Sequence, residues 1–461
     1  MNRLFLICAC TAFLFLIICC NSRSRGEAGG ENGENVQTTD SLATPICVEK
    51  PQVNVYIENS GSMDGFVNGT TAFKNAIGKL LAKLKFYYDE ENIQIYFIRN
   101  DKAQSSRTKE TLNVIKCEID ISNFATAIDL KWRADIRNRG NNTDLNNIFK
   151  EVLNRTDERT ISILCSDCIY SIGNGGVEEL LSHEKWTTYD AFLSHSKNNK
   201  GNLSTTIVKM MSGFNGKYYP YTGDSNGFAY RGDLPYYICV MANQDILDAF
   251  NKNIKLDKGE LDGYDNKYVI SKGISANPYY SVLMATDNKG RFKQQRNISS
   301  LNYVHGIEEI NDKPNKRTGE PFSFGIAIDM KNIDVEEDYI LNTQNYELTE
   351  DVFKVAEVKK VDKNNINAND WQRIKDGNPS HIIILEAKDM HWTNMELGIA
   401  LKKQVPQWIE GSCILDDTKA TYLEEGKSFG LKYWISGIYE AYEEIYPMDK
   451  NYFQVIVSIK K

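Results

Sequence analysis

Short apolar strands alternate with amphipathic helices between residues 49 and 255, and this alternation constrains the fold more than any other feature. Segments 53–57, 93–98, 161–165 and 236–241 are mostly apolar and have the length of strands. Helical patterns follow the first, second and last of these, at 73–87, 145–153 and 245–250. Strands that are apolar on both faces are typical of a parallel sheet covered by helices. We therefore predict a doubly wound, mainly parallel, Rossmann-like α/β sheet.

A chain of 461 residues is too long for one hydrophobic core. Strict alternation at 322–328 and 453–459, with a strong amphipathic helix at 429–442, predicts a second domain that is mainly β or α+β. The predicted organisation is a signal segment at 1–20, a flexible linker at 21–48, the α/β domain at 49–255, a connecting region at 256–320 and the C-terminal domain at 321–461.

The first twenty residues have the pattern of a secretory signal. Arg3 supplies a positive start, the stretch 4–18 is nearly all apolar, and Cys19 and Cys20 close it. This resembles the bacterial lipoprotein signal, and Cys20, preceded by the small Cys19, is the residue we expect to be acylated. An uncleaved signal anchor is the alternative, although the run is shorter than the roughly 20 residues that span a bilayer. Either way we expect an extracytoplasmic protein held at a bacterial membrane.

Charge and cysteine content exclude two broad classes. The net charge is −8 and no stripe of Lys and Arg is present, so we do not expect a nucleic-acid partner. Beyond the signal the cysteines are too sparse for a disulfide scaffold. Cys165 and Cys168 have the spacing of a redox or zinc half-site, but no second pair accompanies them. Buried thiols at a strand end, or a local disulfide, are the alternatives.

Three polar clusters stand where strands end or helices begin, at 58–62, 140–144 and 166–167. Ligands of open α/β sheets bind beyond the carboxyl ends of the strands. Hydroxyls and carboxylates without His or Cys suit a hard divalent ion, so we expect Mg²⁺, or else Ca²⁺ or Mn²⁺.

These clusters resemble the metal-ion-dependent adhesion site of von Willebrand factor A domains, which carry Asp-x-Ser-x-Ser, a later Thr and a later Asp. Ser60, Ser62, Thr143 and Asp167 match that pattern, whereas Glu58 replaces the family's first Asp. The resemblance covers about 200 residues and implies a von Willebrand factor A type lipoprotein. It implies a metal held by Ser60, Ser62 and Thr143, with Glu58 and Asp167 through water, and a protein partner that offers an acidic side chain to the metal.

Each cluster also has a plainer interpretation. Ser and Gly after a strand commonly form turns, and Asn142 or Thr143 could be a helix N-cap. Asp64 and Asp144 are candidates for hydrogen bonds behind the ligands. A degenerate site on the same fold would leave a metal-independent scaffold or envelope-assembly protein.

The sequence contains few candidate catalytic residues, and we predict that the protein has no enzymatic activity. The five histidines are isolated, and no nucleophile elbow, zinc-protease motif or phosphate loop is present. Glu396, Glu410 and the pair Asp416 and Asp417 could act as glycosidase carboxylates, but the pair also fits a solvated turn. Trp408 fits the core better than a sugar platform. The aromatic run 218–221 is either edge packing or a recognition surface.

Overall fold

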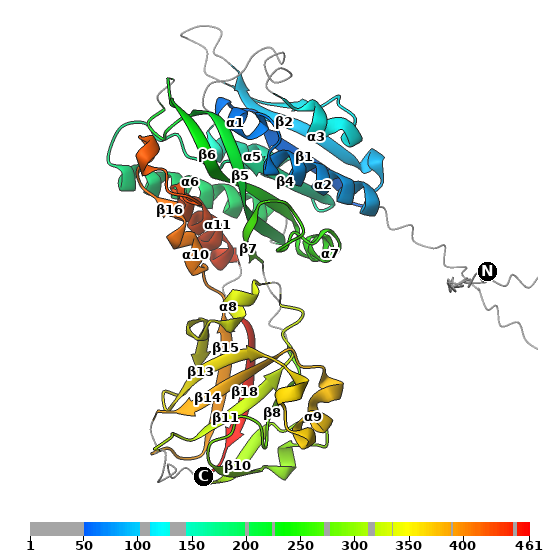
Figure 1. Ribbon diagram of the computed structural model, residues 1–461, viewed down its shortest axis with the longest axis vertical. Coiled ribbons are helices and arrows are strands. Elements are labelled where there is room, and N and C mark those ends of the chain that lie inside the picture. Colours follow the sequence, from blue (N-terminus) through cyan, green and yellow to red (C-terminus); the bar gives the residue numbers. More distant parts are fainter. Residues whose placement is uncertain are drawn as a thin grey trace, which may run out of the picture. The chain divides into compact units, whose positions relative to one another are not determined.

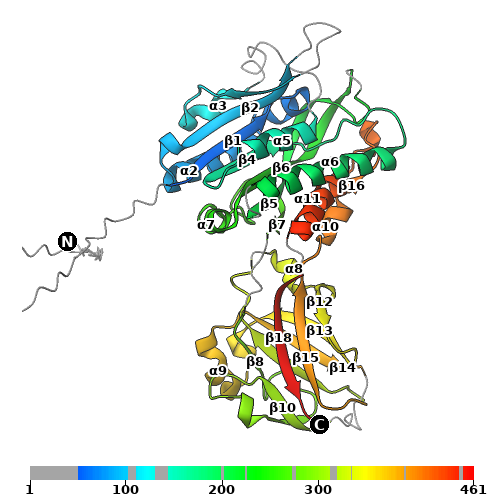
Figure 2. The same cartoon turned by 180° about the vertical axis from the view of Figure 1, so that it is seen from behind.

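The computed structural model describes residues 50–461 apart from 102–110, 130–143, 199–201, 224–225, 272–276, 312–318, 334, 389–390 and 446–449. Figure 1 and Figure 2 show this part from opposite sides. The predicted signal with Cys20, the predicted linker and Thr143 lie outside the described residues. No helix within the described ranges is long and apolar enough to cross a membrane.

The first sheet has seven strands in the order β3-β2-β1-β4-β6-β5-β7. Their bounds are β1 Gln52–Glu58, β2 Ile93–Asp101, β3 Thr111–Lys116, β4 Thr160–Ser166, β5 Leu203–Tyr218, β6 Phe228–Asn243 and β7 Tyr264–Ile270. Strand β1 pairs in parallel with β2 and with β4. Its side chains are buried on both faces, because Val53, Val55 and Ile57 enter one core while Tyr56 enters the other. The predicted α/β character and the parallel centre of the sheet are therefore present.

Helices cover both faces of this sheet, as comparison of Figure 1 with Figure 2 shows. The helices of the first domain are α1 Asp64–Val67, α2 Ala72–Tyr87, α3 Phe124–Ala127, α5 Leu145–Asn154, α6 Val177–Asn198 and α7 Gln244–Ile254. Helix α2 begins where the Thr71 hydroxyl accepts the Lys74 N–H at 3.3 Å, a standard N-cap. Its apolar stripe packs into the same core as Val53, whereas α5 and α6 pack into the core that holds Tyr56.

The other half of the sheet is antiparallel. Strand β6 runs antiparallel to β4 and to β5, β7 runs antiparallel to β5, and β3 runs antiparallel to β2. The prediction of a mainly parallel sheet thus holds for its β2-β1-β4 centre, and four of the six neighbouring pairs differ from it. Strands β5 and β6 form a long hairpin in which Leu203 faces Asn243 and Tyr218 faces Phe228. Its far end extends past the end of β4.

A late segment of the chain also belongs to the first domain. It comprises α10 Gln407–Gly411, β16 Cys413–Ile414, β17 Ser428–Phe429 and α11 Leu431–Ile445. Trp434 is fully buried, with its ring centroid 5.4 Å from that of Tyr237 on β6 and 5.9 Å from that of Phe149 on α5. The amphipathic helix at 429–442, which the sequence places in the C-terminal domain, therefore packs on the first sheet. Its apolar stripe completes the core that α5 and α6 leave open.

Two sheets build the C-terminal β part around a core of their own. The five-stranded sheet has the order β12-β15-β18-β10-β9, and the four-stranded sheet has the order β13-β14-β11-β8. The strands are β8 Tyr280–Val282, β9 Arg291–Gln294, β10 Gly306–Asn311, β11 Ser323–Ile328, β12 Tyr346–Leu348, β13 Phe353–Lys360, β14 His381–Ala387, β15 Met395–Lys402 and β18 Asn451–Ile459. Two short helices accompany them, α8 Glu337–Leu341 and α9 Ala368–Ile374. The predicted β-rich C-terminal part is present, with strands from residue 280 onward.

Candidate metal site at the ends of β1 and β4

The candidate site lies where two neighbouring parallel strands end. Ile57 of β1 is in register with Cys165 of β4, so Glu58 and Ser166 stand side by side at the carboxyl edge of the sheet. The chain turns after β1 through Asn59 and Ser60 into a 3₁₀ turn, Gly61–Met63, and then into α1. This is the edge at which ligands of α/β sheets bind, because loops and helix starts meet there.

Hydrogen bonds join three of the predicted site residues, Ser60, Ser62 and Asp167, and join a fourth, Glu58, to Ser166. The Ser166 hydroxyl donates to Glu58 Oε2 at 2.5 Å, and the hydroxyl oxygens of Ser60 and Ser62 are 2.7 Å apart. The Ser62 hydroxyl also donates to the Asp167 carboxylate. The structure therefore brings together Glu58, Ser60, Ser62 and Asp167. Thr143, the fifth, lies outside the described residues.

Both carboxylates at this site are buried. Glu58 is 4% exposed and Asp167 is 6% exposed. Burial raises the pKa of Asp167 above its ordinary value, although the hydrogen bond from Ser62 opposes that shift. Among the described residues, Asp167 forms no ion pair with Lys, Arg or His. A bound cation would supply the missing positive charge, since a buried carboxylate is costly unless it is paired.

The chemistry of these donors fits a hard divalent ion. Two carboxylates and two hydroxyls offer only oxygen, which Mg²⁺ and Ca²⁺ prefer. In the described part of the chain no group of three or more His, Cys, Asp and Glu side chains is close enough to hold a metal. Glu58 and Asp167 therefore do not form such a group, and a metal at this site would need the serine hydroxyls as further ligands.

Asn59 is a feature of the site that sequence reasoning missed. It is 1% exposed, and neither its side-chain oxygen nor its nitrogen has a hydrogen-bond partner within the described ranges. Only its backbone N–H is bound, to the Ile98 carbonyl at 2.8 Å. A buried amide without partners is uncommon and costs free energy. The signal in the sequence was its place between Glu58 and Ser60.

Asp144 has a structural role. Its carboxylate accepts the backbone N–H groups of Asn146 at 2.8 Å and Asn147 at 3.2 Å, which makes it the N-cap of α5. The sequence suggested Asn142 or Thr143 for this cap, both of which lie outside the described residues. Asp64 opens the short helix α1 directly after the Ser62 turn.

One wall of the site comes from parts of the chain that no sequence motif connects to it. A small pocket at Ser62 and Asp167 is also lined by Tyr218, at the end of β5, and by Lys427 and Ser428 of the late segment. Close packing holds this wall in place, because a Cβ on Gly61 would lie 3.1 Å from the Tyr219 ring. The late segment thus lies beside the candidate metal site.

Asp417 anchors that wall. It accepts the Tyr218 hydroxyl at 2.8 Å and the Tyr221 backbone N–H at 3.1 Å, and it is fully buried. Burial raises its pKa to about 6. Asp416 fits the predicted solvated turn, where its carboxylate binds Thr418, but for Asp417 the solvated turn is wrong. Tyr218 is buried and Tyr221 stacks on Phe429 with 4.4 Å between ring centroids, so both rings are packed.

The cysteines at the end of β4 are buried thiols. Cys165 and Cys168 are both free and fully buried, and burial raises the pKa of each. Cys168 has a positive φ of 52° and its N–H donates to the Ser166 hydroxyl at 2.8 Å. This agrees with the strand-end alternative, and a zinc half-site gains no support.

One histidine that the sequence describes as isolated has partners. His381 Nδ1 is 2.8 Å from the Ser380 hydroxyl, and its Nε2 is 3.0 Å from Glu337 Oε1. The Ser380 hydroxyl also accepts the Met330 N–H at 2.8 Å. This hydroxyl is therefore engaged in joining β14 to the end of β11. Glu410, one of the suggested glycosidase carboxylates, binds Lys432 at 3.0 Å.

Comparisons with models of protein families, with curated proteins and with solved structures found no match to this chain.

Proposed function

We propose that this chain is a membrane-tethered, extracytoplasmic protein-binding module with a von Willebrand factor A type domain. A divalent ion, Mg²⁺ or else Ca²⁺ or Mn²⁺, would be held by Ser60, Ser62 and Thr143, with Glu58 and Asp167 through water. The ion would leave a position for an acidic side chain of a partner. Lipid on Cys20 would hold the module at a bacterial membrane.

The observation that carries this proposal is the buried pair of carboxylates at the ends of β1 and β4, connected to two serine hydroxyls. Separate stretches of sequence contribute these residues, and parallel pairing of β1 with β4 makes them neighbours. A turn or a helix cap would need one of these groups and would not need buried acid on both strands. The arrangement therefore favours an ion over the plainer alternatives.

The first experiment is calorimetric. Mg²⁺, Mn²⁺ and Ca²⁺ are titrated into the chain from residue 21, and thermal unfolding is recorded with and without each ion. We expect saturable binding of at least one ion and a higher melting temperature, because an ion that binds only the folded state stabilises it. The variant Ser60→Ala should weaken binding roughly tenfold, or about 1.4 kcal/mol.

A matched control uses Ser122→Ala, since the Ser122 hydroxyl is exposed and binds Lys85 far from the two strand ends. This variant should bind the ion as the parent does. No heat and no thermal shift for any of the three ions would remove the metal from the proposal.

A metal-independent scaffold is the second candidate, and two observations favour it. Glu58 replaces the Asp of the family pattern, and its carboxylate already has a hydrogen-bond donor in Ser166. The antiparallel β6 beside β4 also departs from a doubly wound sheet. Pull-down with and without a chelator separates the candidates. A partner that survives both chelation and Ser60→Ala would favour the scaffold.

A further inference from the structure

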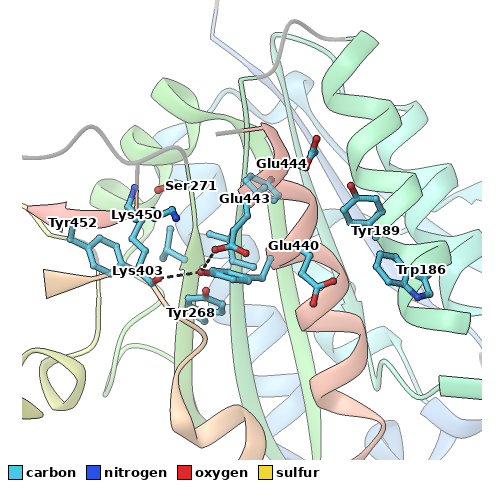
Figure 3. Close-up of a pocket in the computed structure, with 14 residues that line it drawn as sticks. Trp186, Tyr189, Tyr268, Ser271, Lys403, Glu440, Glu443, Glu444, Lys450 and Tyr452 are labelled. Carbon is cyan, nitrogen blue, oxygen red and sulfur yellow. Dashed lines mark hydrogen bonds between the residues drawn. The ribbon is translucent and has the colours of Figure 1, made fainter. Parts of the chain in front are cut away.

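A cavity of about 490 Å³ opens between α6, α11, β7 and the start of β18. Figure 3 shows Trp186 and Tyr189 of α6 on one side of the α11 glutamates, and Lys403 and Tyr452 on the other. Its size is within the ~300–1,000 Å³ of ordinary small-molecule sites. It is unrelated to the strand ends that hold Glu58 and Asp167, because none of those residues lines it.

Aromatic rings form much of the cavity wall. Trp186 is 55% exposed, an unusual exposure for so large a ring, and Tyr189 stands edge-on to it with centroids 5.5 Å apart. Tyr452, Tyr439 and Tyr268 contribute further ring surface. Such rings offer flat apolar faces with little loss of side-chain entropy on binding.

The charged groups of the wall have both signs. Glu440, Glu443 and Glu444 can accept hydrogen bonds from a ligand, and the ammonium groups of Lys403 and Lys450 can donate them. Glu440 is already paired with Lys185 at 2.6 Å, so the wall holds two further carboxylates and two ammonium groups. The balance leaves no net charge to select an anion or a cation. It does supply donors and acceptors at once, which suits a ligand with many hydroxyl groups.

A second cavity of about 220 Å³ shares Tyr268, Val269 and Tyr452 with the first. Its wall adds the rings of Tyr339 and Trp408, four side-chain amides and three charged side chains; the amides are those of Asn266, Asn342, Asn345 and Gln407, and the charged side chains are Lys267, Glu336 and Asp338. Lys267 is paired with Asp257 at 2.6 Å, and Glu336 accepts the Tyr264 hydroxyl. Amides donate and accept without charge. The two cavities together, here called the double cavity, thus repeat one composition, which is aromatic rings beside side chains that donate or accept hydrogen bonds.

We propose that the double cavity binds a neutral oligosaccharide. Sugar rings would lie with their apolar C–H faces on Trp186 and on the tyrosines, while their hydroxyls bond the glutamates, lysines and amides. Two adjoining cavities with one shared wall suit a chain of sugar units. This site is independent of the metal and gives the module a second partner, a glycan.

The test uses the chain from residue 21, with EDTA present so that failure of the metal site has no influence. Chitotetraose, maltohexaose, cellohexaose and mannohexaose are titrated while tryptophan fluorescence and heat are recorded. We expect saturable binding of at least one of them. The variant Trp186→Ala should weaken it roughly tenfold, equal to about 1.4 kcal/mol. Because Trp186 is more than half exposed, its removal should leave the melting temperature nearly unchanged.

Two matched controls complete the test. The variant Phe86→Ala removes a ring that is 80% exposed on α2, outside the cavity, and should bind as the parent does. The variant Glu443→Gln keeps the shape and removes one charge, and should weaken binding of the same sugar by about threefold. The proposal is overturned if none of the four sugars saturates or if Trp186→Ala binds equally well. It is also overturned if tetramethylammonium or acetate displaces the sugar at equal concentration, because an ion site would then be present.

Discussion

The two halves of the seven-stranded sheet are assembled from different distances along the chain. The β2-β1-β4 half pairs in parallel and is covered by helices that adjoin those strands in sequence. The β6-β5-β7 half pairs antiparallel, and part of its cover arrives about two hundred residues later. Tyr237 meets Ser428 at 2.8 Å, and Thr205 meets Tyr442 at 2.9 Å. The predicted metal-site residues follow β1 and β4 in the parallel half. The pocket wall beside them is formed by Tyr218 of β5 in the antiparallel half and by the late segment.

The largest expected effect is that of Trp434→Ala on the stability of the first domain. If α11 completes the first core, removing this fully buried ring should lower the free energy of unfolding by about 3–5 kcal/mol, through lost burial and a cavity. Urea unfolding followed by circular dichroism measures the change. The exposed Phe86→Ala serves as the control and should stay within about 0.5 kcal/mol. An unaffected Trp434→Ala would mean that the late segment adds nothing to the first sheet.

The second prediction concerns Asp417 and pH. Its pKa in the folded chain is about 6, above the ordinary 3.8, so the folded state binds the proton more tightly than the unfolded chain. The stability that this proton contributes is complete below about pH 4. It is lost as the pH rises to about 6, by roughly 3 kcal/mol.

Asp417→Asn cannot titrate, so the parent should lose stability relative to this variant across that pH window. Asparagine has one acceptor oxygen for the two donors, Tyr218 and Tyr221, so at pH 4 the variant should be the less stable protein. Thermal unfolding at pH 4, 5, 6 and 7 measures both effects. Parallel pH profiles of the two proteins would contradict the assignment to Asp417.

The third prediction concerns the role of Glu58 in ion binding. Glu58→Gln keeps an oxygen that can accept the Ser166 hydroxyl and removes the charge. We expect divalent-ion affinity to fall about 10–100-fold, the range found when groups that support a metal site are replaced. Calorimetry measures the affinity, and a melting temperature without ion serves as the control for folding. Equal affinity in both proteins would assign Glu58 to structure alone.

The smallest expected effect on ion affinity is that of Lys427. This residue lines the pocket that Asp167 also lines, and it forms a partly exposed ion pair with Glu424. Removing its charge with Lys427→Met should tighten divalent-ion binding slightly, by about 0.2–1 kcal/mol, because a positive neighbour repels the ion. The gain should vanish at about 1 M salt, where the Debye length is about 3 Å. A gain that persists in high salt would point to a change in packing.

The sequence was sufficient for features that depend on neighbours in the chain. Strand β1, the turn after it and helix α2 follow from apolar spacing, and the closeness of Glu58 to the end of β4 follows from parallel pairing. The antiparallel direction of strands β6, β5 and β7 was not predicted. The stretch between Tyr218 and Phe228 contains Pro220, Gly223 and Gly227, which is a hairpin signal between two long strands.

Other features had no local signal at all. Asp417 looks like its neighbour Asp416 in the sequence, and only the distant Tyr218 makes it a buried anchor. The stripe of α11 shows that Trp434 and its neighbours need a partner, but a stripe does not say which surface it covers. Long-range packing decides such cases.

The late return of residues 407–445 to the first sheet also has a consequence for biosynthesis. A ribosome must make the chain through α11, Leu431–Ile445, before this helix can cover its place beside α6 and β6. Until then the apolar surface formed by Phe192, Phe149 and Tyr237 is not covered by Trp434 of α11. Chains that end before α11 would keep this surface uncovered and would be easily recognised by chaperones and proteases, so the first domain cannot complete its core until residue 445 has been made.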